Sequence, residues 1–213
     1  MASLSTVGRL LLVVLVGGSL CACEVKVNTS GESATKPAET AKESPSSKPA
    51  SPPKDALDSP EAYYSRGVDR FGAQDNNGAI ADFSEAIRLK PEYAEAFFNR
   101  GTAYTLTKDY AASINDFNQF IRLKPDNALG YFKRGMSKMF TSDKPGAIAD
   151  LTQAMTIDPE YADPYVSRGL TKSELGDKQG AKADIDKALE LYKKQGKTKE
   201  YNDVMDLMKS VGL

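Results

Sequence analysis

The dipeptide Arg-Gly recurs along this chain at a constant interval of 34 residues, and this interval is the strongest constraint on its fold. The four copies are Arg66-Gly67, Arg100-Gly101, Arg134-Gly135 and Arg168-Gly169. The same interval separates four aspartates and three prolines, which are Asp75, Asp109, Asp143, Asp177, Pro91, Pro125 and Pro159. A fixed period of this length indicates a stack of short helical units, each of which buries its apolar face against its neighbours.

The pattern inside each unit resembles the tetratricopeptide repeat family. A small and a large residue lie four positions apart on one expected helix face, as Ala79/Phe83, Ser113/Phe117, Ala147/Leu151 and Ala181/Ile185. The resemblance covers residues 60–195 and implies an all-α fold, a right-handed superhelical array of four helix-turn-helix repeats. The repeats are expected at 60–93, 94–127, 128–161 and 162–195. In each repeat the aspartate is expected to cap the second helix, and in the first three the proline ends it.

Two features depart from a uniform array. Phe120 stands where the other three copies have alanine, at Ala86, Ala154 and Ala188. A ring at a methyl-sized position is expected either to push helices apart or to fill a local gap. After the fourth repeat, apolar residues return at helical spacing, which predicts an amphipathic capping helix within residues 196–213. These residues are Tyr201, Val204, Met205 and Met208.

The first 22 residues have the composition of a secretory signal. Arg9 precedes seven consecutive apolar residues, and small residues follow them. So short an apolar stretch is not expected to span a bilayer, which takes about 20 residues. The segment that ends at Cys23 resembles the bacterial lipobox, which implies cleavage before Cys23 and lipid on its thiol and amino group. The chain is then expected in the bacterial cell envelope, anchored to the membrane on its extracytoplasmic side. The alternative is a soluble secreted protein in which Cys23 is incidental.

Residues 23–59 are built mainly from Ser, Pro, Lys, Glu, Thr and Ala and contain no aromatic residue. A segment with so little apolar surface cannot offset the entropy lost on ordering, so we expect it to be disordered. We interpret it as a tether between the lipid anchor and the array. A specific ligand for a partner protein is the alternative for this segment.

The charge balance and the missing histidine exclude several classes of function. The chain has 28 Lys and Arg against 29 Asp and Glu, and so small a net charge gives no basic field for nucleic acid. Histidine, the commonest general base and metal ligand, does not occur. Neither a nucleophile elbow nor a phosphate-binding glycine loop is present in the sequence. We therefore expect a protein that is not an enzyme and has no metal, cofactor or small-molecule substrate.

A second constant spacing connects the arginine of each repeat to an aspartate 16 residues later. The pairs are Arg66 and Asp82, Arg100 and Asp116, Arg134 and Asp150, and Arg168 and Asp184. The family usually has an apolar residue at the position of these arginines. Because a guanidinium matches a carboxylate with two parallel hydrogen bonds, we predict structural ion pairs between helices. A ligand-binding role for the same residues is the alternative.

The family resemblance implies a concave groove lined by the first helices of successive repeats. The groove positions carried over are Tyr64, Phe98, Phe132 and Val166 at one level and Val68, Thr102, Met136 and Leu170 at the next. A third level has Phe71, Thr105, Met139 and Ser173, and Asn99 and Lys133 are the polar exceptions. This lining suits an extended peptide or an amphipathic helix. Two alternatives remain open: several of these residues are packed between repeats, or the capping helix occupies part of the groove.

One subset of the family grips the C-terminal carboxylate of chaperones with Lys, Asn, Asn, Lys and Arg. The matching positions here are Tyr64, Val68, Asn99, Leu129 and Lys133, of which only Asn99 agrees, so a chaperone co-factor is not expected. The expected function is that of a membrane-anchored scaffold that binds a protein or peptide partner during assembly of cell-envelope complexes. The alternatives are a scaffold that associates with itself through its array ends and a non-catalytic regulator of an envelope enzyme.

Overall fold

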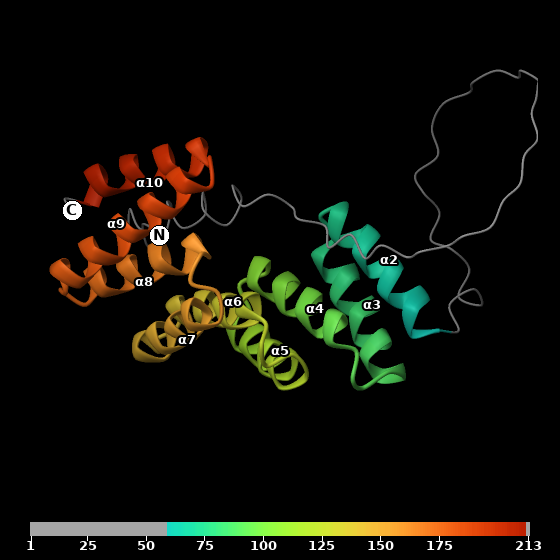
Figure 1. Ribbon diagram of the computed structural model, residues 1–213. Helices are drawn as coiled ribbons and strands as arrows, with labels where there is room; N and C mark the ends of the chain where they lie inside the picture. The colour runs from blue at the N-terminus through green and yellow to red at the C-terminus, as the bar shows by residue number, and fades with distance from the viewer. Residues whose placement is uncertain (1–58, 212–213) are drawn as a thin grey trace, which may run out of the picture. The chain divides into compact units, whose positions relative to one another are not determined.

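The computed structural model describes residues 59–211, so the expected signal, Cys23 and nearly all of the tether lie outside the described residues. Within residues 59–211 the chain forms nine α-helices and no strand (Figure 1). They are α2 (Pro60–Gly72), α3 (Asn76–Leu89), α4 (Ala94–Leu106), α5 (Tyr110–Leu123), α6 (Ala128–Met139), α7 (Lys144–Ile157), α8 (Ala162–Glu174), α9 (Lys178–Lys194) and α10 (Thr198–Val211). Within this part of the chain, no helix has the length and apolar character that crossing a membrane requires.

The helices form pairs, and the pairs stack in sequence order. α2 packs on α3, α4 on α5, α6 on α7 and α8 on α9, while the second helix of each pair packs on the first helix of the next. The first helices of adjacent repeats also touch, as α2 and α4 do. The predicted all-α array of helix pairs is therefore confirmed. Because each repeat buries its apolar face only against its neighbours, the stability of the array depends on these interfaces.

The periodic aspartates cap the second helix of every repeat as expected. Asp75 accepts a hydrogen bond from the backbone N–H of Gly78 at 2.9 Å, and Asp177 accepts one from Gly180 at 2.8 Å. Asp109 and Asp143 do the same at the starts of α5 and α7. In the first two repeats the residue before the cap has a positive φ, 63° at Gln74 and 65° at Lys108. The backbone at these two positions has a conformation that favours glycine.

The repeated glycine lets the two helices of a pair approach closely. A Cβ atom at Gly67 would lie 2.7 Å from Cε1 of Phe83, which is fully buried. The counterparts of Phe83 in the later repeats, Phe117, Leu151 and Ile185, are also fully buried. The large residue of each small-large pair therefore packs against the backbone of the preceding helix. A Cβ atom would clash with it at Gly67 and would make unusually tight contacts of 3.0–3.2 Å at the other three glycines.

In the first and third repeats a tyrosine that follows the second helix packs on an aromatic residue of the first helix. The rings of Tyr93 and Tyr64 have centroids 4.9 Å apart, and those of Tyr161 and Phe132 are 5.1 Å apart. The second repeat has Asn127 at the corresponding position, and an amide cannot fill the space that a phenol ring fills.

Phe120 fills this space in the second repeat. Its ring centroid lies 5.0 Å from that of Phe98, and its side chain is buried with Ala94 and Phe97. Room for the ring comes from Gly130, where a Cβ atom would lie only 2.7 Å from Cδ1 of Phe120. Of the two expectations for this ring, the structure shows the filling of a local gap.

The C-terminal helix α10 packs on α9, where the first helix of a fifth repeat would lie (Figure 1). Val204, Leu207 and Met208 are buried in this contact face, while Asn202 and Asp203 are exposed. The predicted capping helix is confirmed, and it begins at Thr198 because α9 continues to Lys194. Its exposed face gives the C-terminal end of the stack a polar surface.

Candidate functional site

An arginine–aspartate pair joins the two helices of every repeat. Nε of Arg100 donates to Oδ2 of Asp116 at 2.8 Å and its Nη2 donates to Oδ1 at 2.7 Å. The pairs of Arg134 with Asp150 and of Arg168 with Asp184 have the same geometry, as does the pair of Arg66 with Asp82. The aspartates are buried, and both carboxylate oxygens of each accept from the arginine. This engagement supports the structural interpretation of these residues over a ligand-binding one.

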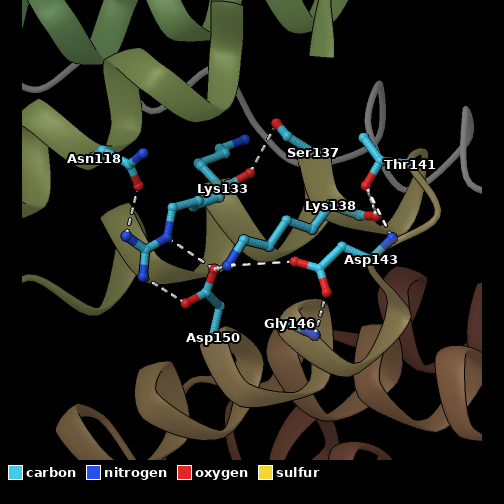
Figure 2. Close-up of polar contacts among 9 residues, drawn as sticks. Asn118, Lys133, Ser137, Lys138, Thr141, Asp143, Gly146 and Asp150 are labelled. Atoms are coloured by element: carbon cyan, nitrogen blue, oxygen red, sulfur yellow. Dashed lines mark hydrogen bonds and ion pairs between the residues drawn. The ribbon is translucent and has the colours of Figure 1, made fainter. Parts of the chain in front are cut away.

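The remaining guanidinium nitrogen, Nη1, connects adjacent repeats. Nη1 of Arg100 donates to Oγ of Ser84 at 3.0 Å, and Nη1 of Arg134 donates to Oδ1 of Asn118 at 2.8 Å (Figure 2). Arg168 reaches Oγ1 of Thr152 in the same way at 2.9 Å. Each of these three guanidinium groups therefore holds three helices. The acceptor positions are not obvious from the sequence, because serine, asparagine and threonine alternate there, although they share the 34-residue interval.

The aspartate of the second repeat has fewer cations around it than the others. Asp150 lies 2.9 Å from Nζ of Lys138 in addition to its arginine (Figure 2), and Asp82 and Asp184 also have a second cation, Arg70 and Lys172. The second repeat has Tyr104 at this position. Burial raises the pKa of Asp116 above its usual value, and the hydrogen bonds and charge of Arg100 only partly oppose this effect.

Most of the predicted groove positions in the third and fourth repeats are buried, and only Lys133 and Ser173 among them are partly exposed. Five of its positions are 4% exposed or less, namely Phe132, Met136, Met139, Val166 and Leu170. Phe132 packs edge-on against Tyr161, and Sδ of Met136 lies 3.8 Å from the Ser167 hydroxyl of the next repeat. These five residues are therefore buried inside the array, which was the alternative left open for them: Tyr161 of the same repeat covers Phe132, and Ser167 of the next repeat contacts Met136.

The corresponding positions of the first two repeats remain accessible. Val68 is 42% exposed, and Leu106, which the sequence analysis did not include, is 47% exposed. Six predicted positions here are partly buried, namely Tyr64, Phe71, Phe98, Asn99, Thr102 and Thr105. Seven of these residues are called the open groove segment below, namely Tyr64, Val68, Phe71, Phe98, Asn99, Thr102 and Leu106. The signal for Leu106 in the sequence is its position four residues after Thr102 on α4, because residues four apart share one helix face.

Two polar positions of the predicted groove are occupied by contacts within the protein. Nδ2 of Asn99 donates to the hydroxyl of Tyr64 at 2.8 Å, which joins α4 to α2. Thr105 belongs to a cluster of hydroxyl groups with Ser113 at 2.7 Å and Ser137, and Ser113 and Ser137 are 2.8 Å apart. This cluster is not predicted from the sequence, in which its one signal is Ser113 at a position that is alanine in the other repeats.

Lys133 is a half-buried cation on α6. Its Nζ lies 5.8 Å from the centroid of the Phe132 ring, and none of the ion pairs formed within residues 59–211 includes it. Burial lowers the pKa of the Lys133 ammonium, and the charge of Asp163 partly opposes this shift. Lys133 therefore places a partly desolvated positive charge one repeat beyond the open groove segment.

Comparison with known proteins gives matches to two family models. A model described as TPR repeat matches residues 71–108, and one described as tetratricopeptide repeat matches residues 94–127 and 162–195. The latter two ranges have the bounds of the second and fourth repeats derived from the 34-residue period. No curated protein matches the sequence of this chain.

Several solved structures share the fold at low sequence identity. MamA, residues 41 to the end, from Desulfovibrio magneticus RS-1 is 21% identical, with a TM-score of 0.63 over 65% of this chain and 78% of that one. The TPR domain of Arabidopsis OM64 is 20% identical, with a TM-score of 0.52 over 54% and 94%. The first TPR of Spaghetti (RPAP3), bound to the HSP90 peptide SRMEEVD, is 18% identical, with a TM-score of 0.53 over 55% and 93%. With its 34-residue period, its stacked helix pairs and the family-model matches over residues 71–127 and 162–195, this chain contains tetratricopeptide repeats.

Proposed function

We propose that this chain is a non-catalytic scaffold that binds a peptide or helix of a partner protein on the open groove segment. The observation that carries the proposal is the difference between the two halves of the groove. The third and fourth repeats bury five of their seven predicted groove residues, whereas Val68 and Leu106 expose large apolar side chains on the first two. Aliphatic side chains beside partly exposed rings form a surface that gains free energy when a partner covers it.

The composition of this surface indicates the kind of partner. Tyr64 packs on Phe83 and Tyr93, and Phe98 packs on Phe117 and Phe120, so both partly exposed rings keep fixed positions. A rigid aromatic surface of this kind suits apolar side chains at intervals along an extended peptide or an amphipathic helix. Lys133 favours a partner that carries an acidic or carbonyl group at that end of the surface. The peptide-bound structure of RPAP3, which has the same fold, supports this use of the array.

We further propose that the array is held at a membrane of the bacterial envelope and takes part in the assembly of envelope complexes. The support is in the sequence: the apolar leader, the lipobox-like segment at Cys23 and the Ser- and Pro-rich residues 23–59. Two lipid chains on Cys23 would hold the protein firmly, since each buried methylene contributes about 0.8 kcal/mol. Expression in a bacterium tests this part: Cys23→Ser removes the lipidated thiol and is expected to change both the mass of the protein and its partition into the membrane fraction. Equal mass and partition of both forms would refute the anchor.

The N-terminal end of the array argues against the alternative of self-association by stacking. The position of Asp69 in α2 is taken by Ala103, Ser137 and Thr171 in the later repeats, and all three are completely buried. A further helix stacked on α2 would therefore bury the carboxylate of Asp69, which is exposed in the structure. Burying an unpaired carboxylate costs several kcal/mol.

The binding proposal is tested with a displayed library of random peptides and the immobilised full-length chain. We expect the library to yield binders that the double variant Val68→Ser with Leu106→Ser captures about 30-fold more weakly, since about 2 kcal/mol of apolar burial is lost. Leu175→Ser is the matched control, because Leu175 is an exposed leucine that directly follows α8 and lies outside the open groove segment. Equal capture by the double variant and the parent, with circular dichroism unchanged, would refute the proposal.

A further inference from the structure

A hollow of about 430 Å³ lies at the edge of the array, next to the segments that connect α5 to α6 and α7 to α8. Leu129, Ile157 and Tyr161 supply its apolar lining, and Asp126 and Asp158 supply two carboxylates. The two acids come from consecutive connections between repeats. The hollow is separate from the open groove segment, which is formed by residues of α2 and α4.

The first repeat shows what the corresponding place holds when the chain fills it. There Nζ of Lys90 lies 4.4 Å from the ring centroid of Tyr93 and 3.2 Å from Oε1 of Glu61. A lysine ammonium is thus placed over a tyrosine ring beside a carboxylate, with both interactions made inside the protein.

The third repeat keeps the tyrosine and loses the lysine. The equivalent positions two repeats later are Tyr161 for Tyr93, Asp158 for Lys90 and Leu129 for Glu61. The lysine has become an acid, and the place of Glu61 is apolar. Among residues 59–211, no lysine or arginine lies over the Tyr161 ring as Lys90 lies over Tyr93.

We propose that this hollow receives a lysine or arginine side chain of the partner protein, which takes the place that Lys90 takes in the first repeat. The methylene stem contacts Leu129 and Ile157, the cation lies against Tyr161, and the carboxylates of Asp126 and Asp158 neutralise it. This inference rests on the proposed function, since it assigns one side chain of the bound protein to a second contact point.

The lining is arranged to accept such a cation. The edge-on contact of Phe132 fixes the Tyr161 ring, with the two ring planes at 64°. Burial and the charges of Asp163 and Asp158 raise the pKa of Tyr161, so its phenol stays neutral and carries no charge of its own. Oδ1 of Asp158 accepts the backbone N–H of Glu160 at 3.0 Å, which orients the carboxylate and leaves its other oxygen for a guest.

The test is a titration of the isotope-labelled full-length chain followed by nuclear magnetic resonance. The probes are the N-acetyl, N′-methyl amides of lysine, arginine and norleucine, of which the last has a similar length and no charge. We expect the lysine and arginine probes to shift the amide signals of residues 126–129 and 157–161, and norleucine to bind at least fivefold more weakly. Equal binding of norleucine, or no shift at these residues with any probe, would overturn the proposal.

One substitution copies the first repeat into the third. Asp158→Lys introduces a lysine at the position of Lys90, and we expect it to abolish the shifts caused by the cationic probes. Asp203→Lys makes the same change of charge on the exposed face of α10 and is expected to keep them. Equal weakening by both variants would mean that only net charge matters, which would also overturn the proposal.

The peptide library separates this inference from the proposed function. If binders to the open groove segment are captured equally by the parent and Asp158→Lys and carry no common lysine or arginine, the hollow is not a contact point and the proposed function stands. If the cationic probes bind in the hollow while no library peptide is captured, the hollow binds cations and the proposed function fails.

Discussion

The contact between Gly130 and Phe120 allows the packing argument to be tested with a single methyl group. In Gly130→Ala the new Cβ would lie 2.7 Å from Cδ1 and 2.8 Å from Cε1 of the ring, and 3.2 Å from Cγ1 of Ile121. The ring has little freedom to withdraw, because it is 6% exposed and packs on Phe98. Overpacking of this kind costs about 1–3 kcal/mol. Position 130 lies in the first turn of α6, where alanine regains only part of its propensity advantage of about 1 kcal/mol. We therefore expect a net loss of about 1–2 kcal/mol.

A double-mutant cycle gives the prediction its sharper form. Phe120→Ala alone leaves a cavity and is expected to cost about 3–5 kcal/mol. Combined with Gly130→Ala, it restores the alanine pair that the preceding interface has at Ala86 and Ala96. In that background the added methyl group no longer clashes and fills part of the cavity. The double variant is therefore expected to be more stable than the sum of the two single changes by at least about 1 kcal/mol.

The assay is urea unfolding of the full-length chain, followed by far-ultraviolet circular dichroism. Gly72→Ala is the matched control, because a Cβ atom at the end of α2 would have nothing within 4 Å. We expect this control to be neutral or slightly stabilising. Strictly additive effects of the Gly130 and Phe120 changes would refute the claim that the ring and the glycine are adapted to each other.

Three further predictions use the same unfolding measurement. Lys108→Gly is expected to stabilise the protein by up to about 1 kcal/mol, because φ is 65° at this position and the fourth repeat already has Gly176 there; destabilisation would contradict the strain. Arg100→Met is expected to lower the free energy of unfolding by about 3–5 kcal/mol, and by more than Arg134→Met does. Within residues 59–211, Asp116 has no second cation beside it, whereas Asp150 keeps Lys138, so the reverse order would contradict this reasoning. Because the pKa of Asp116 is raised in the folded protein, the folded state binds more protons than the unfolded state at mildly acidic pH. The loss of unfolding free energy caused by Asp116→Asn is therefore expected to be larger near pH 3.9, about the ordinary carboxyl pKa, than at neutral pH. A loss that grows as the pH rises would show that the ion pair outweighs burial.

The sequence predicted those features that recur in every repeat. The helix pairs, the aspartate caps and the spacing of each arginine from its aspartate all follow from a 34-residue interval, because they involve one repeat or two adjacent ones at a fixed separation. The pairing of Arg100 with Asp116 was predictable from the sequence for this reason. The capping helix was also predictable, since Val204 and Met208 follow a helical period after the last repeat.

The accessible part of the groove could not be predicted in this way. Mapping the family positions treats all four repeats alike, yet Val68 is exposed and its counterparts Met136 and Leu170 are buried. Exposure depends on contacts with side chains from other repeats, such as the contact of Met136 with Ser167 of the next repeat, and the family positions do not specify these contacts. Phe120 shows the same limit: the sequence left two outcomes open, and the choice depended on Asn127 and Gly130, whose contacts only a three-dimensional structure reveals.

The links that Arg100, Arg134 and Arg168 make to the preceding repeat also have a mechanical consequence. Charge-assisted hydrogen bonds are short and directional, so they resist changes in the spacing between the second helices they connect. Each link therefore favours one separation of the two second helices, so a change in the curvature of the array would have to lengthen or break these hydrogen bonds on the side that carries them.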